Sequence, residues 1–147
     1  MRHALVLVAN ASHARLLEVR AGKVVNRLEF MNPEARQREL DLVSDKPGRQ
    51  FIASGRRGSL RTGYGNDTQH DREKDTFAIE LAREIDTHVH NTPLDVAIIA
   101  PPELLGLLRR ALGTEATRHV KWSITHDLTA LRDAEVLDAV SKVETHA

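Results

Sequence analysis

The chain has 147 residues, of which 41% are hydrophobic, and its 21 basic and 21 acidic side chains cancel. This length and apolar content suit one core, so we expect residues 1–147 to form a single domain. A net charge of zero excludes a strong overall field for nucleic acid or anionic membranes, so any electrostatic function must be local. The absence of cysteine excludes disulfides, thiolate nucleophiles and cysteine-based zinc sites.

Neither a signal peptide nor a membrane span is indicated by the sequence. The apolar run near the N-terminus covers only residues 4–9, whereas the core of a signal peptide has roughly 7–15 apolar residues. No stretch approaches the roughly 18 apolar residues of a membrane span. We therefore expect a cytoplasmic protein that makes no contact with the membrane.

Extended segments dominate the first part of the chain. Residues 5–8 form a continuous apolar run, which is typical of a strand covered on both faces. Residues 14–20 and 24–30 are predicted as two further strands. They are joined at Ala21-Gly22, because glycine permits the positive φ of a tight hairpin. No period persists from residue 32 to residue 68, so a long connection is expected there.

Helices and strands alternate in the remainder of the chain. Thr68 and Asp71 match a capping box, which predicts that a helix begins at Thr68, and its apolar stripe continues to Val89. Two strands and two helices complete the prediction, at residues 94–100, 102–112, 120–124 and 133–143. The order βββαβαβα indicates an α/β fold, a ribonuclease H-like mixed five-stranded sheet with helices packed on it.

A basic, glycine-rich stretch lies inside the long connection, at about residues 44–68. Between Lys46 and Asn66 there are five basic residues and no acidic one, so the rest of the chain carries five net negative charges because the total is zero. Arginine binds phosphate oxygens with two prongs, and glycine lets the backbone approach a ligand closely. The alternative is a solvated loop without a ligand. The residues predicted to bind RNA are Lys46, Gly48, Arg49, Arg56, Arg57, Gly58 and Arg61.

Other kinds of site have less support. A two-metal nuclease needs several carboxylates at the centre of the sheet, but the first strand ends at Asn10, and Asp95 opens a later strand at the opposite end. His88 and His90 are two residues apart, so a helix points them to different faces and does not pair them for zinc. The sequence also lacks the glycine motif of a dinucleotide site. We expect no metal and no cofactor.

The predicted helix at residues 102–112 is rich in leucine. It begins with Pro102 and stops before Gly113, which is the usual placement of these two residue types at helix ends. A wide apolar helix is most often part of a core, and the second interpretation is a surface for self-association. The leucines concerned are Leu104, Leu105, Leu107, Leu108 and Leu112.

Short segments spread over nearly the whole chain match, in order, the sequence pattern of a known family. They are Val8-Ala9-Asn10, Ala14-Arg15-Leu16, residues 42–49, Phe77-Ala78, Glu80-Leu81-Ala82, Ala100-Pro101-Pro102, residues 105–109 and Asp127-Leu128. In this order they resemble the bacterial family named for attachment to host cells. That family is similar to the middle, catalytic domain of the archaeal and eukaryotic class-1 release factors, which has a ribonuclease H-like core.

The resemblance implies a function for the long connection. In release factors, the corresponding loop carries a Gly-Gly-Gln tip that enters the ribosomal peptidyl-transferase centre and helps water cleave peptidyl-tRNA. Gly48-Arg49-Gln50 is the similar segment here, with arginine at the middle position, so Gln50 is the candidate catalytic residue. The candidate supporting residues are Asn10, Ser44, Asp45 and His70.

Two functions follow as hypotheses. The first is a ribosome- or RNA-associated factor of translation termination or ribosome rescue, with peptidyl-tRNA hydrolysis as its reaction if it is an enzyme. The second is a cytoplasmic regulatory or interaction protein that host-cell attachment requires indirectly and that has no catalytic activity.

Overall fold

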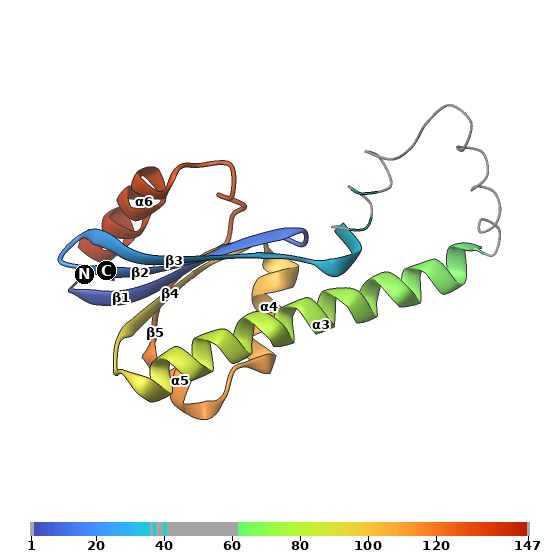
Figure 1. Cartoon of the computed structure of the whole chain (residues 1–147), viewed down its shortest axis with the longest axis horizontal. Helices are drawn as coiled ribbons and strands as arrows, with labels where there is room; N and C mark the ends of the chain where they lie inside the picture. The colour runs from blue at the N-terminus through green and yellow to red at the C-terminus, as the bar shows by residue number, and fades with distance from the viewer. Residues whose placement is uncertain (1, 36, 38–39, 41–61, 147) are drawn as a thin grey trace.

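The computed structural model describes residues 2–35, 37, 40 and 62–146, and Figure 1 shows their arrangement. Five strands form one sheet, with helices on both of its faces. The strand order is β3-β2-β1-β4-β5. This arrangement places the N-terminal strand in the middle of the sheet and leaves β3 and β5 at its edges.

The first three strands form an antiparallel meander. They are β1 (His3–Ala9), β2 (His13–Arg20) and β3 (Lys23–Met31), which confirms the three strands predicted in this region. The turn between β2 and β3 has positive φ at both Ala21 (51°) and Gly22 (78°). Two such residues make the tight hairpin turn whose twist matches that of the flanking strands.

The last two strands are parallel to β1. β4 (Asp95–Ile99) pairs directly with β1, and β5 (Val120–Ile124) pairs with β4. The result is the predicted mixed α/β sheet of ribonuclease H-like arrangement, in which β2 alone runs against its neighbours on both sides.

Helices cover the two faces unequally. On one face lie α3 (Thr62–Asn91), α4 (Pro102–Ala111) and the short α5 (Thr114–His119), and on the other lies α6 (Asp133–His146) (Figure 1). In the same view the first part of α3 extends beyond the sheet, and its later turns cross the sheet face.

Two hydrophobic clusters meet at β1, one on each side of the sheet. Leu5 and Leu7 pack with Phe77 and the rest of the α3–α4 side, while Val6 and Val8 pack on the side of α6. Because alternate side chains of a strand point to opposite faces, burial on both faces explains the unbroken apolar run of β1.

Several helix boundaries differ from the prediction. α3 begins at Thr62, six residues earlier than predicted, so Thr68 lies within the helix and is not its cap. Residues 33–35 are also helical, following Asn32, whose side-chain oxygen accepts a hydrogen bond from the Glu34 N–H at 3.0 Å. The capping-box pattern misled the prediction, because the glycines at positions 63 and 65 concealed the first turns of α3.

The sequence also failed to predict α5. Its six residues bury only Ala116, which gives no periodic pattern to detect. Gly113 is extended (φ −70°) and precedes α5, and its N–H donates to Asp86 Oδ1 at 3.0 Å. A Cβ at Gly113 would lie 3.3 Å from that same oxygen, so a larger residue there would require the Asp86 side chain to shift.

Candidate functional site

The predicted RNA-binding residues lie outside the part of the chain that the structure describes. The same holds for Gln50, Ser44 and Asp45, so all of these stay predictions. His70 lies within α3, and its side chain is outside the part of the molecule that the structure describes. The remaining candidate, Asn10, lies directly after β1 at one end of the sheet, and all its side-chain hydrogen bonds are described.

Asn10 follows the end of β1 and joins two loops. Its Nδ2 group donates to Asp127 Oδ2 at 3.1 Å and to Thr129 Oγ1 at 3.0 Å. Its Oδ1 atom accepts from the backbone N–H groups of Ser12 and His13, both at 2.8 Å. The sequence singled out Asn10 for its position, and the structure shows that it ties the β1–β2 turn to the loop before α6.

Asp127 is held ionised by its neighbours. Partial burial opposes its charge, but the hydroxyl and N–H of Thr129 and the amide of Asn10 donate to the carboxylate and lower its pKa below the ordinary value of 3.8. The Thr129 hydroxyl lies 2.6 Å from Asp127 Oδ1. Asp127 is therefore a negative charge at neutral pH that already has three donors.

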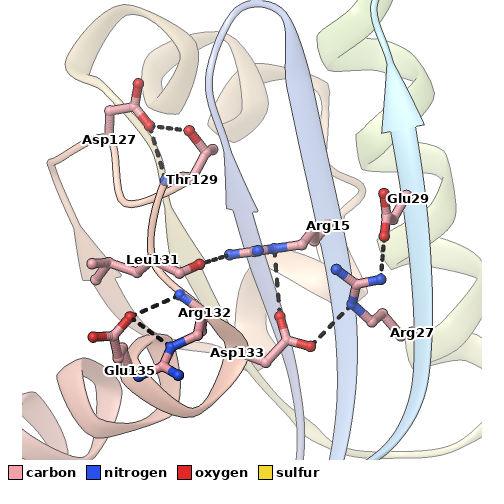
Figure 2. Close-up of polar contacts among 9 residues, drawn as sticks. All are labelled: Arg15, Arg27, Glu29, Asp127, Thr129, Leu131, Arg132, Asp133 and Glu135. Carbon is pink, nitrogen blue, oxygen red and sulfur yellow. Dashed lines mark hydrogen bonds and ion pairs between the residues drawn. The ribbon is translucent and has the colours of Figure 1, made fainter.

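An ion-pair network connects β2 and β3 with the start of α6 (Figure 2). Asp133 Oδ2 accepts from Arg27 Nε at 3.0 Å, and Asp133 Oδ1 lies 3.6 Å from Arg15 Nε. Arg15 also donates from Nη2 to the Leu131 carbonyl at 2.8 Å, and Arg27 contacts Glu29. We name Arg15, Arg27, Glu29 and Asp133 the arginine–aspartate network.

This network was not predicted from the sequence. Arg15 interrupts an apolar strand, and its Nε atom and Asp133 Oδ1 are both buried without a hydrogen-bond partner among the described residues. A charge inside an apolar strand is the signal that could have drawn attention to Arg15, since buried arginine requires a partner. Its partner lies more than a hundred residues away, so no local pattern could have identified Asp133.

The first turn of α6 is fixed by a cap. The N–H of Arg132 donates to Glu135 Oε1 at 2.9 Å, which is the reciprocal half of a capping box. That bond, the charge of Arg132 and its side chain lower the pKa of the Glu135 carboxyl below its ordinary value. The cap orients Asp133, the first residue of α6, toward the sheet.

A shallow hollow of about 320 Å³ lies beside the network. Its walls include His13, Arg15, Arg27, Glu29 and Thr129. Both arginines are already paired with carboxylates, so the hollow carries mixed charge and no excess for an anion. Within residues 2–35, 37, 40 and 62–146, no three His, Asp or Glu side chains are grouped to hold a metal ion.

A second, more apolar hollow of about 230 Å³ lies between α3 and α4. Its walls include Ala78, Ile79, Leu107 and Ala111, with Asp75 and Arg110 as its charged members. Ile79 is 44% exposed, which is high for a large apolar side chain. This surface is suited to contact with another apolar group rather than to catalysis.

The leucines of α4 face mainly inward. Leu104, Leu105, Leu108 and Leu112 are buried, and Leu107 is partly buried against the same cluster. The expected self-association through residues 102–112 stays a prediction, with only Leu107 partly exposed. None of the helices in the described ranges is both long and apolar enough to cross a membrane.

Fold and site together define an α/β protein of ribonuclease H-like topology, in which Asn10 and Asp133 join loops to the sheet. The chain belongs to the family described as "Protein required for attachment to host cells", whose profile matches residues 5–140. No curated protein gives a significant match to the sequence.

Solved structures of other proteins share parts of this shape. The ethanolamine utilization protein EutJ from Carboxydothermus hydrogenoformans is 16% identical, with a TM-score of 0.47, covering 87% of this chain and 46% of that one. The Ppx/GppA phosphatase of Aquifex aeolicus is 10% identical, with a TM-score of 0.42, covering 85% and 36%.

A chain in a PilM–PilN type IV pilus biogenesis complex is 17% identical, with a TM-score of 0.42, covering 95% of this chain and 42% of that one. The chain thus spans less than half the length of each of these three structures.

Proposed function

We propose that the protein is an RNA-associated factor that contacts phosphate groups through the basic segment, residues 46–61. The observation that carries the proposal is the separation of charge along the sequence. The basic segment has five basic residues and no acidic one, and the remainder carries five net negative charges. A locally positive segment on an otherwise negative chain suits contact with an anionic polymer at that segment alone.

The position of α3 supports this proposal. The helix begins at Thr62, directly after the basic segment, and its first turn has no acidic residue. The N-terminal end of a helix carries a partial positive charge and free N–H groups, which favour phosphate. From Thr62 to Phe77, the first buried side chain described in α3, the helix is about 22 Å long.

The kind of RNA that the protein would bind is proposed from the resemblance to release factors. That similarity favours ribosomal RNA or peptidyl-tRNA, with Gln50 as the candidate catalytic residue. The described residues contribute the scaffold, a helix that starts where the basic segment ends.

The first prediction concerns binding. The variant Arg56→Ala, Arg57→Ala, Arg61→Ala should fold normally and bind ribosomes at least about tenfold more weakly at low salt, because three phosphate contacts are lost. The slope of log Kd against log salt should fall by about two. Co-sedimentation with purified ribosomes over a salt series measures both quantities.

A matched variant controls for the change in net charge. Arg83→Ala, Arg110→Ala, Arg118→Ala removes the same number of charges from exposed positions on α3, α4 and α5. It should bind like the unmodified protein. Equal binding by all three proteins would show that the basic segment does not bind the ribosome.

The second prediction concerns catalysis. If Gln50 takes part in peptidyl-tRNA cleavage, Gln50→Ala should release peptide from stalled ribosome complexes at least about tenfold more slowly while co-sedimenting normally, since only the reaction is affected. The measurement is release of a labelled peptide. Lack of release by the unmodified protein would show that the protein binds without hydrolysing.

A second candidate function is an interaction protein without RNA. The observation in its favour is the apolar hollow between α3 and α4 with exposed Ile79. Under this function the protein would show no salt-dependent binding to ribosomes, and Ile79→Asp would abolish capture of the protein partner. The ribosome co-sedimentation experiment therefore separates the two functions.

A further inference from the structure

We infer that two copies of the chain associate through β3, antiparallel to each other, so that the two sheets become one. The inference is independent of the proposed RNA association. It begins from the position of β3, a nine-residue strand at the edge of the sheet. Most of its residues are exposed, among them Val25 at 53% and Leu28 at 37%. Free strand edges are templates for pairing with another strand.

The backbone groups of β3 that bond to no other strand among the described residues can be assigned from its pairing with β2. Met31 lies opposite His13, and the Asn32 N–H donates to the Ser12 carbonyl at 2.8 Å. Hydrogen-bonded and non-hydrogen-bonded pairs alternate along an antiparallel ladder. Even-numbered residues from Asn26 to Phe30 therefore bond to β2, and the backbone groups of Arg27, Glu29 and Met31 point to the free edge.

A local contact agrees with this assignment. The Arg27 N–H donates to Asn26 Oδ1, a side-chain acceptor of the neighbouring residue, at 2.9 Å. An N–H bonded in this way is not used in the ladder with β2. It is available to a second strand once the Asn26 side chain rotates.

These groups restrict the register of two β3 strands. In an antiparallel pair, residues whose backbone groups point to the outer edge must lie opposite residues of the same kind in the other copy. These residues are all odd-numbered, so the twofold axis that relates the two strands must pass through one residue position, where the two copies of that residue face each other, and not between two positions. Centring the axis on Arg27 would place arginine opposite arginine, and centring it on Glu29 would place glutamate opposite glutamate. Like charges directly opposite are destabilising.

Centring the axis on Leu28 removes both conflicts. Arg27 of each copy then faces Glu29 of the other, and Asn26 faces Phe30. The two Leu28 side chains meet as a non-hydrogen-bonded pair, the kind in which side chains lie closest. Both charges are accessible in the single chain, since 43% of the Arg27 side chain and 60% of the Glu29 side chain are exposed. The strand is thus complementary to a second copy of itself.

The test uses charge reversal in the purified full-length chain without RNA. Arg27→Glu and Glu29→Arg each place like charges opposite each other twice in the dimer, so each variant should dimerise at least about tenfold more weakly. An equal mixture of the two variants should form a heterodimer, because every facing pair is then opposite in sign. Sedimentation velocity over a concentration series measures these species.

Matched variants on α3 control for charge alone. Glu80→Arg, Arg83→Glu and their mixture make the same changes at exposed positions away from β3, and each should dimerise like the unmodified chain. Glu29→Pro removes an outward-pointing N–H together with the Glu29 carboxylate, keeps the contact between Arg27 and Asp133, and should also prevent dimerisation.

Amide exchange gives an independent measurement. The N–H groups of Arg27 and Glu29 should become protected as concentration rises, while those of Leu28 and Phe30 should be protected at every concentration. A chain that stays monomeric, a dimer that survives Glu29→Pro, or a mixture that fails to reassociate would each overturn the inference. RNA is absent throughout, so these outcomes are separate from those of the ribosome experiment.

Discussion

The Asn10 side chain makes four hydrogen bonds, which is the full capacity of an amide. Two of its partners are backbone N–H groups of the β1–β2 turn, and two belong to the loop before α6. A residue used in this way fixes the geometry of that end of the sheet. Its suggested support of the basic segment stays a prediction, because the segment itself lies outside the described residues.

A third prediction concerns Asp127 and pH. Thr129→Val removes the hydroxyl that donates to Asp127, so the pKa of Asp127 should rise toward its ordinary value of 3.8. The variant loses two hydrogen bonds, the one donated to Asp127 and the one accepted from Asn10, so the free energy of unfolding at neutral pH should fall by about 1–2 kcal/mol. Carboxyl NMR titration and urea unfolding measure the two effects.

The sign of the pH dependence follows from the lowered pKa. Asp127 binds its proton more weakly in the folded state than in the unfolded state, so its contribution to stability is present above pH 3.8 and is lost as pH falls through the lower, folded pKa. Thr129→Val should reduce that acid loss. Thr87→Val, at an exposed position of α3, is the control and should leave the titration of Asp127 unchanged.

Among the elements, α3 packs against the sheet, α4 and α5. Its buried side chains line one hydrophobic cluster, and Asp86 binds the backbone where α4 ends and α5 begins. That contact holds the Gly113 backbone, directly before α5, against α3. A sequence pattern cannot show it, because Asp86 and Gly113 are 27 positions apart and Asp86 resembles any partly exposed acid.

A fourth prediction tests this junction. Gly113→Ala should lower the free energy of unfolding, because the added Cβ would crowd Asp86 Oδ1 at 3.3 Å. Asp86→Ala should cost about 1 kcal/mol through the lost hydrogen bond. In the double variant the crowding is gone, so the cost of Gly113→Ala should shrink by about 0.5 kcal/mol or more.

Urea unfolding of the four proteins measures this coupling. Asp86→Asn, which keeps an acceptor for the Gly113 N–H, is the matched control and should retain most of the stability. Strictly additive costs would show that the two residues do not act on each other.

For the molecule as a whole, the five strands, their order along the chain and the mixed sheet could be predicted because each strand has its own hydrophobic pattern, whereas the order of the strands within the sheet was not predicted. β1 is apolar throughout, and the β2–β3 turn is marked by Gly22. The arginine–aspartate network could not be predicted, since it requires contact between β2, β3 and the distant start of α6. The candidate RNA-binding residues were chosen for their positive charge and for the glycines among them, and they remain untested.

The middle position of β1 has a consequence for synthesis. β1 pairs on one side with β2, which follows it closely, and on the other side with β4, about ninety residues later. Contacts between residues far apart in the chain form late, because closing a long loop is costly in entropy. As the nascent chain emerges, the β1–β2–β3 meander can fold first. The edge of the apolar strand β1 that pairs with β4 then stays unpaired until β4 has been synthesised.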